Sequence, residues 1–155
     1  MRFFICKHDP GEHWDYREHR SVLSDEWTWW GPIRSHRDDL APGGIILMYD
    51  TKAREVWGAV EALPWDDGSM FQWGDYRTKG GDIKEGWGFR GRLVGFGPTH
   101  VTAREFEAIA GPLNAKGFRT HARISFKPIH ERLGRGLYER VGHGSARHPR
   151  RKRRG

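Results

Sequence analysis

Between Pro42 and Ala62 the sequence reads PGGIILMYDTKAREVWGAVEA. The Pro-Gly-Gly turn signal leads into the apolar run 45–49, and residues 55–62 then alternate at the period of a strand. The segment between the two runs, residues 50–53, has the length of a hairpin connection. The stretch therefore predicts two consecutive antiparallel strands.

Further strands are expected on both sides of this hairpin. Residues 3–7 form a short apolar run before Asp9-Pro10-Gly11 and predict a buried first strand. Residues 64–88 predict a long loop. Residues 87–96 predict another strand after it, and residues 118–126 predict the last strand. Residues 12–40 are polar and irregular, and we expect one or two short helices there.

Two short helices are expected in the C-terminal half. Thr102 and Glu105 have the spacing of a capping box, and the helix that they open should end at Gly111-Pro112. Pro128 suits the start of a final helix, with apolar residues following at helical spacing. Strands joined by hairpins outnumber helices, so the sequence predicts an α+β fold with a mostly antiparallel, curved or barrel-like sheet.

Size and composition indicate one folded domain. The chain has 155 residues, of which 20 are aromatic (8 Trp, 4 Tyr and 8 Phe), enough to fill a core with few aliphatic side chains. The single cysteine, Cys6, excludes an internal disulfide and a zinc site built from several cysteines. No apolar run reaches the ~18 residues of a membrane span. We expect a soluble intracellular protein, cytoplasmic or, in a eukaryote, nuclear, and no contact with a membrane.

The charge is distributed unevenly along the chain. Residues 1–112 hold 14 basic and 18 acidic residues, whereas residues 113–155 hold 13 basic and 2 acidic residues. Such asymmetry favours a polyanionic partner. We expect two regions, a folded domain at 1–142 and a disordered basic tail at 143–155. The tail would contact phosphates without reading sequence, or serve as a localisation signal; its cations are Arg147, Arg150, Arg151, Lys152, Arg153 and Arg154.

Six short segments occur in an order that resembles the EVE domain family. His8, Ser35 and Gly44 depart from the family pattern, so the chain resembles a divergent member. The segments are FICKHDP at Phe4–Pro10, Trp14-Asp15, WGPIRS at Trp30–Ser35, PGGIILMY at Pro42–Tyr49, VWGAVE at Val56–Glu61 and ISFKPI at Ile124–Ile129. This resemblance implies a PUA-like fold, a small β-barrel with short flanking helices, related to the YTH and ASCH domains. It also implies binding of DNA or RNA with a modified base held in an aromatic pocket.

A pocket for a base needs aromatic faces for stacking, polar groups for the base edge and cations for phosphates. The candidates combine residues of the resembling segments with tryptophans of the long loop. They are Trp30, Trp27, Arg34, Ser35, Lys7, Trp73, Trp65 and Ser125. Each has a structural alternative: the tryptophans could fill the core, and Arg34 could pair with a neighbouring aspartate.

Other functions remain open at this point. The His-rich stretch 8–19 could serve an ASCH-like nuclease, and a third alternative is an interaction protein that has lost its pocket. The spacing of the histidines in residues 8–19 fits no standard metal motif, so neither a metal nor a cofactor is expected. No nucleophile motif is visible, and we expect a binding module that is not an enzyme. The sequence leaves the oligomeric state undetermined.

Overall fold

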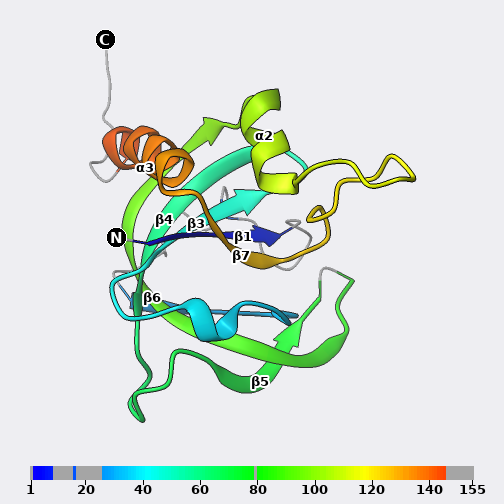
Figure 1. Ribbon diagram of the computed structural model, residues 1–155. Helices are drawn as coiled ribbons and strands as arrows, with labels where there is room; N and C mark the ends of the chain where they lie inside the picture. Colours follow the sequence, from blue (N-terminus) through cyan, green and yellow to red (C-terminus); the bar gives the residue numbers. More distant parts are fainter. Residues whose placement is uncertain (1, 9–15, 17–25, 79, 146–155) are drawn as a thin grey trace.

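The computed structural model of the chain describes residues 2–8, 16, 26–78 and 80–145, with the backbone alone for residues 142–145. The described part is an α+β domain with a mixed sheet, one 3-10 turn and two helices (Figure 1). The elements are β1 (Phe3–His8), β2 (Glu26–Gly31), η2 (Arg37–Asp39), β3 (Ile45–Asp50), β4 (Glu55–Leu63), β5 (Gln72–Arg77), β6 (Ile83–His100), α2 (Ala103–Ala110), β7 (Phe126–Ile129) and α3 (Glu131–Ser145).

The strands follow the order β2-β6-β4-β3-β1-β7, and β5 pairs with β6 beside this path. Neighbouring strands are antiparallel except β1 and β3, which run parallel with Phe3 opposite Ile45. The described strands form a curved, open sheet with β2 and β7 at its ends. The predicted α+β fold with a mostly antiparallel, curved sheet is confirmed, whereas no strand pairing among the described residues closes the sheet into the small barrel that was expected.

Strand β6 holds the sheet together because it pairs on both of its sides. Residues 87–92 pair with β2 on one side, while residues 83–88 pair with β5 and residues 90–100 with β4 on the other. The β4–β6 register shifts twice, between Val56 and Gly58 and between Ala59 and Val60. Such irregularities increase the local bend of a strand, which fits the curvature of β6 in Figure 1.

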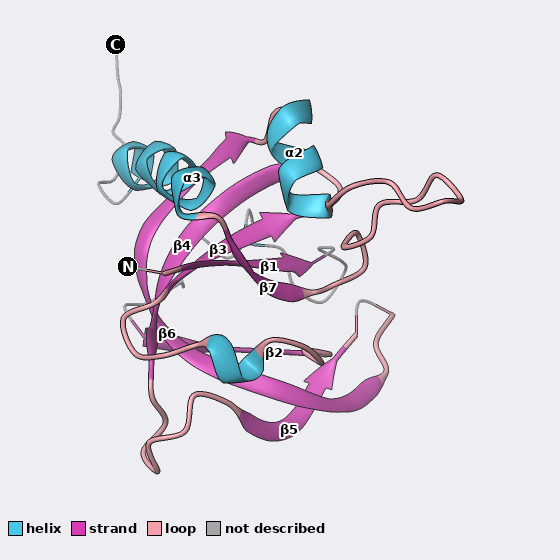
Figure 2. Ribbon diagram, viewed as in Figure 1, coloured by secondary structure: helices cyan, strands magenta, loops and turns pink. Residues whose placement is uncertain are grey.

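The sheet separates two apolar cores. One face of β1 and β3, with Phe3, Ile5 and Leu47, packs against Leu137 and Val141 of α3, and we call it the helix face. Figure 2 shows both helices on this side. The opposite, inner face is lined by side chains from the central strands and from β6 and β7: Phe4, Cys6, Ile46, Met48, Trp57, Phe89 and Phe126. Phe4 and Phe126 stack at 5.3 Å between ring centroids.

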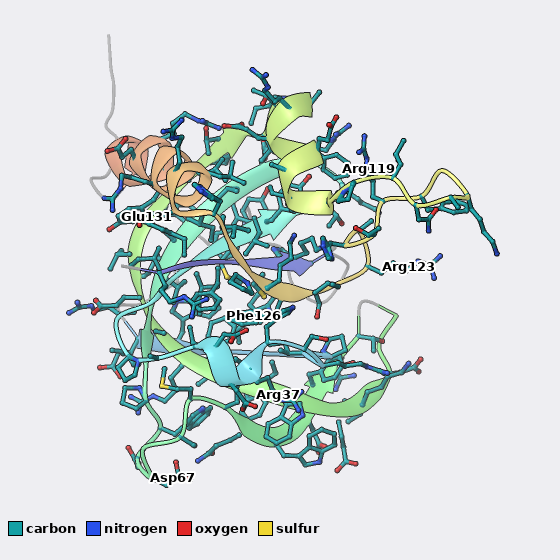
Figure 3. All side chains as sticks on the ribbon, in the orientation of Figure 1. Arg37, Asp67, Arg119, Arg123, Phe126 and Glu131 are labelled. Atoms are coloured by element: carbon teal, nitrogen blue, oxygen red, sulfur yellow. The ribbon has the colours of Figure 1, made fainter. Side chains whose placement is uncertain are left out.

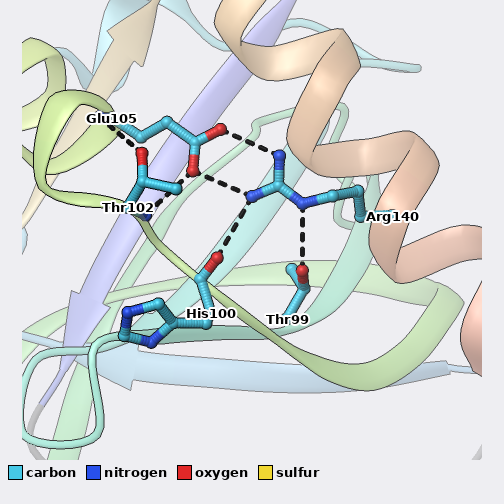
Figure 4. Close-up of polar contacts among 5 residues, drawn as sticks. All are labelled: Thr99, His100, Thr102, Glu105 and Arg140. Carbon is cyan, nitrogen blue, oxygen red and sulfur yellow. Dashed lines mark hydrogen bonds and ion pairs between the residues drawn. The ribbon is translucent and has the colours of Figure 1, made fainter.

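Arg140 fastens α3 to the end of β6 and the start of α2 (Figure 4). Its guanidinium donates to both Glu105 carboxylate oxygens at 2.8 and 2.9 Å, to the Thr99 hydroxyl at 3.0 Å and to the His100 carbonyl at 3.2 Å. Glu105 also accepts from the Thr102 backbone amide, which completes the predicted capping box. The hydrogen bonds from the Arg140 guanidinium make the largest contribution to lowering the pKa of Glu105, so the pair stays ionised near neutral pH.

Several sequence expectations are confirmed. The buried first strand, the hairpin of β3 and β4, and the helix between Thr102 and Gly111 lie where they were predicted. A final helix is also present, although it begins at Glu131 and Pro128 lies in β7. Helix α3 continues through Ser145, past the expected domain boundary at residue 142.

The short helices expected within 12–40 are confirmed in part, because η2 lies at Arg37–Asp39, whereas residues 26–31 form β2. Two other expectations were wrong. The long loop at 64–88 contains β5 and the start of β6. The strand expected at 118–126 is mostly turn, and the last strand begins only at Phe126. Within the described residues, no helix is long and apolar enough to span a membrane.

Two glycines of α3 provide a matched test of the helix–sheet contact. A Cβ at Gly134 would clash with the Phe3 side chain, whereas a Cβ at Gly136 meets nothing within 4 Å. We expect Gly134→Ala to lower the free energy of unfolding by about 1–3 kcal/mol through overpacking. Gly136→Ala should raise it by up to about 1 kcal/mol, because alanine is the better helix former. Urea unfolding of both variants measures the difference, and equal effects would contradict this packing of α3 on β1.

Candidate functional site

The pleat of β2 sends its tryptophans to opposite faces of the sheet. Trp27 and Trp29 pack against the inner core. Trp30 lies on the other face, where its ring covers Gly88 of β6 and Gly74 of β5. Side chains of neighbouring strand residues alternate between faces. The predicted pocket that combined Trp27 with Trp30 is thus divided by the sheet itself.

The inner end of the sheet gathers what we call the inner aromatic cluster: His8, Tyr16, Trp27, Trp29 and Trp57. Tyr16 stacks on Trp57 with ring centroids 4.7 Å apart and an interplanar angle of 8°. Trp29 lies 4.9 Å from His8 and 5.7 Å from Trp27. Trp57 is not among the binding residues predicted from the sequence. The period of β1, with Phe4 and Cys6 facing inward, was the signal that could have placed His8 beside it.

Hydrogen bonds fix most of the polar atoms in this cluster. The Trp57 indole donates to His8 Nε2 at 2.6 Å. The Tyr16 hydroxyl donates to Asp50 Oδ2 at 2.9 Å and lies 3.1 Å from Glu55 Oε1. Burial and the bond to Asp50 raise the pKa of Tyr16 far above its ordinary value, so this hydroxyl remains a donor. Fully buried Asp50 also accepts from the backbone amides of residues 52 and 53.

Trp27 is the exception among these polar groups. Its Nε1 atom is buried and has no hydrogen-bond acceptor among the described residues. A buried donor without an acceptor costs about 1–3 kcal/mol relative to a paired one. Such a group in a native protein calls for an explanation, and a bound ligand with an acceptor atom is one.

The remaining predicted tryptophans lie on other surfaces. Trp65 donates from its indole to the Gly88 carbonyl at 3.1 Å and lies 5.6 Å from Trp30. Trp73 is 55% exposed and meets Trp87 edge to face at 5.2 Å. The guanidinium of Arg37, the first residue of η2 and labelled in Figure 3, lies over the Trp87 ring at 4.4 Å from its centroid. Trp65 and Trp73 therefore do not join Trp27.

Two of the other predicted residues, Lys7 and Ser125, meet at the junction of the two sheet ends. The Lys7 backbone amide donates to the Ser125 carbonyl at 2.7 Å. The Ser125 hydroxyl donates to the Pro32 carbonyl at 3.2 Å and so links β7 to the segment after β2. Arg34 and Ser35, both exposed, follow directly. This junction adjoins the inner aromatic cluster because His8 follows Lys7 in β1.

The Lys7 side chain points to the helix face and not into the cluster. Its ammonium donates to the carbonyls of His121 and Ala122 at 2.7 and 2.9 Å. Burial, and second the charge of Lys127, lowers the pKa of Lys7 to about 8. Burial also lowers the pKa of Lys127. Lys127 lies opposite Ile5 and is 8% exposed, so two desolvated cations share this end of the sheet.

The remaining sequence candidates are the tail cations, the His-rich stretch and Cys6. The tail cations at 147–154 and most of the His-rich stretch 8–19 lie outside the described residues. Over the described ranges, no group of three or more His, Cys, Asp or Glu side chains could hold a metal ion. Burial raises the pKa of the Cys6 thiol to about 12, so this cysteine is not a ready nucleophile.

Comparison with known proteins gives one solved structure to report, the Pho92 YTH domain in complex with m6A. It is 14% identical in sequence, with a TM-score of 0.48, and the match covers 94% of this chain and 85% of that chain. No family model matches the chain, and no curated protein does. The resemblance to EVE domains stays a prediction.

The lysine pair gives a direct electrostatic test. Lys127→Met removes a cation next to Lys7, so we expect the pKa of Lys7 to rise from about 8 toward its ordinary value of 10.5. Lys127→Arg keeps the charge and should leave the pKa of Lys7 low. NMR titration of the lysine ε-methylene signals measures both variants. The same Lys7 pKa in the two variants would show that Lys127 does not act on it.

Proposed function

We propose that this chain is a nucleic-acid-binding module that holds a base, in the finer version a modified base, at the inner aromatic cluster. The observation that carries the proposal is the Trp27 indole donor, which has no acceptor among the described residues and lies in the same cluster as the bonded Trp57 indole and Tyr16 hydroxyl. A nucleobase fits this cluster for two reasons. Its ring or carbonyl acceptors can take the hydrogen bond of the Trp27 indole, and its flat face can stack on the aromatic rings.

The surroundings of the cluster support a polyanionic ligand. Arg34 and Ser35 are exposed next to the Ser125–Pro32 bond at the junction of the sheet ends. The chain from residue 108 to residue 130 contains no acidic residue and four basic ones. Cations of this kind contact phosphates, which position a nucleic acid without reading its sequence. In this proposal the basic tail adds affinity and the cluster supplies the selectivity.

The role proposed is binding and not catalysis. A nuclease would need a histidine able to exchange a proton with the substrate. His8 is the histidine of the 8–19 stretch that the structure describes, and its Nε2 accepts the hydrogen bond from Trp57. That bond occupies the nitrogen lone pair on which a general base depends.

Trp27→Phe tests the proposal, because it keeps a ring and removes the unpaired donor. We expect the variant to melt near the parent temperature, since no protein hydrogen bond is lost. Its preference for oligonucleotides with N6-methyladenine or 5-methylcytosine over plain RNA and DNA should fall about tenfold, equivalent to about 1.4 kcal/mol. Fluorescence anisotropy titrations measure both affinities, and melts accompany them.

Two variants serve as controls for Trp27→Phe. Trp57→Phe also removes an indole donor, but one that His8 accepts, and it should lower the melting temperature more. Trp30→Ala changes the opposite face and should leave selectivity intact if the protein stays folded. Selectivity lost only in Trp30→Ala would move the base site to that face. A parent that does not distinguish modified from plain bases would overturn the proposal, and cleaved oligonucleotides would favour the nuclease.

A further inference from the structure

The segment 112–123, which we call the basic hairpin, projects from the body of the protein beyond α2 (Figure 1). Its fold is fixed by backbone bonds from Thr120 to Pro112 at 3.0 Å and from Asn114 to Phe118 at 2.7 Å. The Asn114 side-chain oxygen accepts from the amides of Lys116 and Phe118 at 2.8 and 3.0 Å. Gly117 adopts a φ of +87°, which favours glycine. The tip is therefore a defined turn.

This rigid turn holds apolar side chains in water. Phe118 is 68% exposed and Leu113 is 57% exposed. Exposed aromatic area on a braced hairpin costs hydrophobic free energy without stabilising the fold. Exposed apolar side chains that a partner can bury therefore mark the hairpin as a contact surface.

The basic hairpin contains three cations and no acidic residue of its own. Lys116 and Arg123 are exposed and make no ion pair with any described residue. Arg119 instead braces the hairpin, donating to the Gly111 carbonyl at 3.2 Å and lying 3.4 Å from Glu107. Figure 3 shows Arg123 pointing away from the body and Arg119 against α2. Arg119 thus stabilises the hairpin, whereas Lys116 and Arg123 face solvent.

The base of the hairpin is anchored to β1 and lies near the segment that follows β2. Lys7 donates to the carbonyls of residues 121 and 122, and the Ser125 hydroxyl donates to the Pro32 carbonyl, two residues before Arg34. The hairpin belongs to the segment 108–130, which contains no acidic residue.

We propose that the basic hairpin is a second contact for single-stranded nucleic acid, in which the Phe118 ring stacks on a base while Lys116 and Arg123 contact phosphates. An exposed ring beside two unpaired cations matches a ligand that alternates flat bases with phosphates. The inference rests on the proposed function for its class of ligand, but it uses different residues and predicts a different measurement.

The test compares two exposed apolar residues of the same hairpin. Phe118→Ala should weaken binding of a plain 12-nucleotide oligo(U) or oligo(dT) roughly five- to hundredfold, because one stacked base is lost. Leu113→Ala removes similar exposed apolar character without a ring and should change affinity less than twofold. Phe118→Trp should bind at least as well as the parent. Both residues are at the surface, so the thermal melts of the three variants should match that of the parent.

A second variant tests the phosphate contacts. Lys116→Ala with Arg123→Ala should reduce the slope of log affinity against log salt by about 1.4, since two single-strand phosphate contacts are lost. The modified-to-plain affinity ratio should remain that of the parent in every hairpin variant. A parent that binds the plain 12-mers but lacks this ratio would overturn the proposed base site alone.

Three results would overturn the hairpin proposal. These are parent-like binding by Phe118→Ala, equal losses in Phe118→Ala and Leu113→Ala, and a parent that does not bind the plain oligonucleotides at low salt. Vesicles with phosphatidylserine in phosphatidylcholine provide the comparison for another anionic partner. Vesicle binding lost in Phe118→Ala, with oligonucleotide binding unchanged, would assign the hairpin to a membrane surface instead.

Discussion

The close approach of neighbouring residues to three glycines of β6 is the constraint on which the rest of the structure depends. At Gly86 the neighbouring Gly31 carbonyl occupies the space of a side chain, at Gly88 the Trp30 ring does, and at Gly91 the Val60 side chain does. Any other residue at these points would push a neighbouring strand or ring away. Because β6 has no side chain at these three glycines, neighbouring strands can pair with it on both sides while it bends. The bend gives the sheet its concave inner face.

The same geometry decides which aromatic residues can act together. Once β2 is registered on β6 with Trp30 opposite Gly88, the pleat turns Trp27 and Trp29 inward. The inner rings then meet residues from β1 and β4, namely His8 and Trp57, which are distant in sequence. Trp30 in turn packs over glycines beside Trp65. A one-residue slip of β2 would exchange the two sets, so register, and not the number of tryptophans, determines the candidate site.

Local signals in the sequence predicted the elements whose stability is local. The β3–β4 hairpin follows from alternation around Asp50, which accepts the amides of its own turn, and α2 follows from the Thr102–Glu105 capping box. Strand β2 escaped prediction because EWTWWG lacks β-branched alternation and depends on pairing with β6 for its stability. Residues 118–125 resembled a strand, but the Asn114 cap and Gly117 commit them to turns. Of the site, residue types were predictable, and the face of each residue was not.

The distribution of paired and unpaired cations connects the fold to its proposed ligand. Within the described C-terminal region, Arg119, Arg135 and Arg140 have carboxylate partners at Glu107, Glu131 and Glu105. These arginines fasten α2, α3 and the base of the hairpin, so their charge is compensated within the protein. The excess positive charge of this region is shared between the buried Lys127 and cations that face solvent. Two of the solvent-facing cations, Lys116 and Arg123, lie on the hairpin that carries the exposed ring of Phe118. Exposed cations on the same hairpin as an exposed ring concentrate the attraction for a polyanion at one edge of the protein.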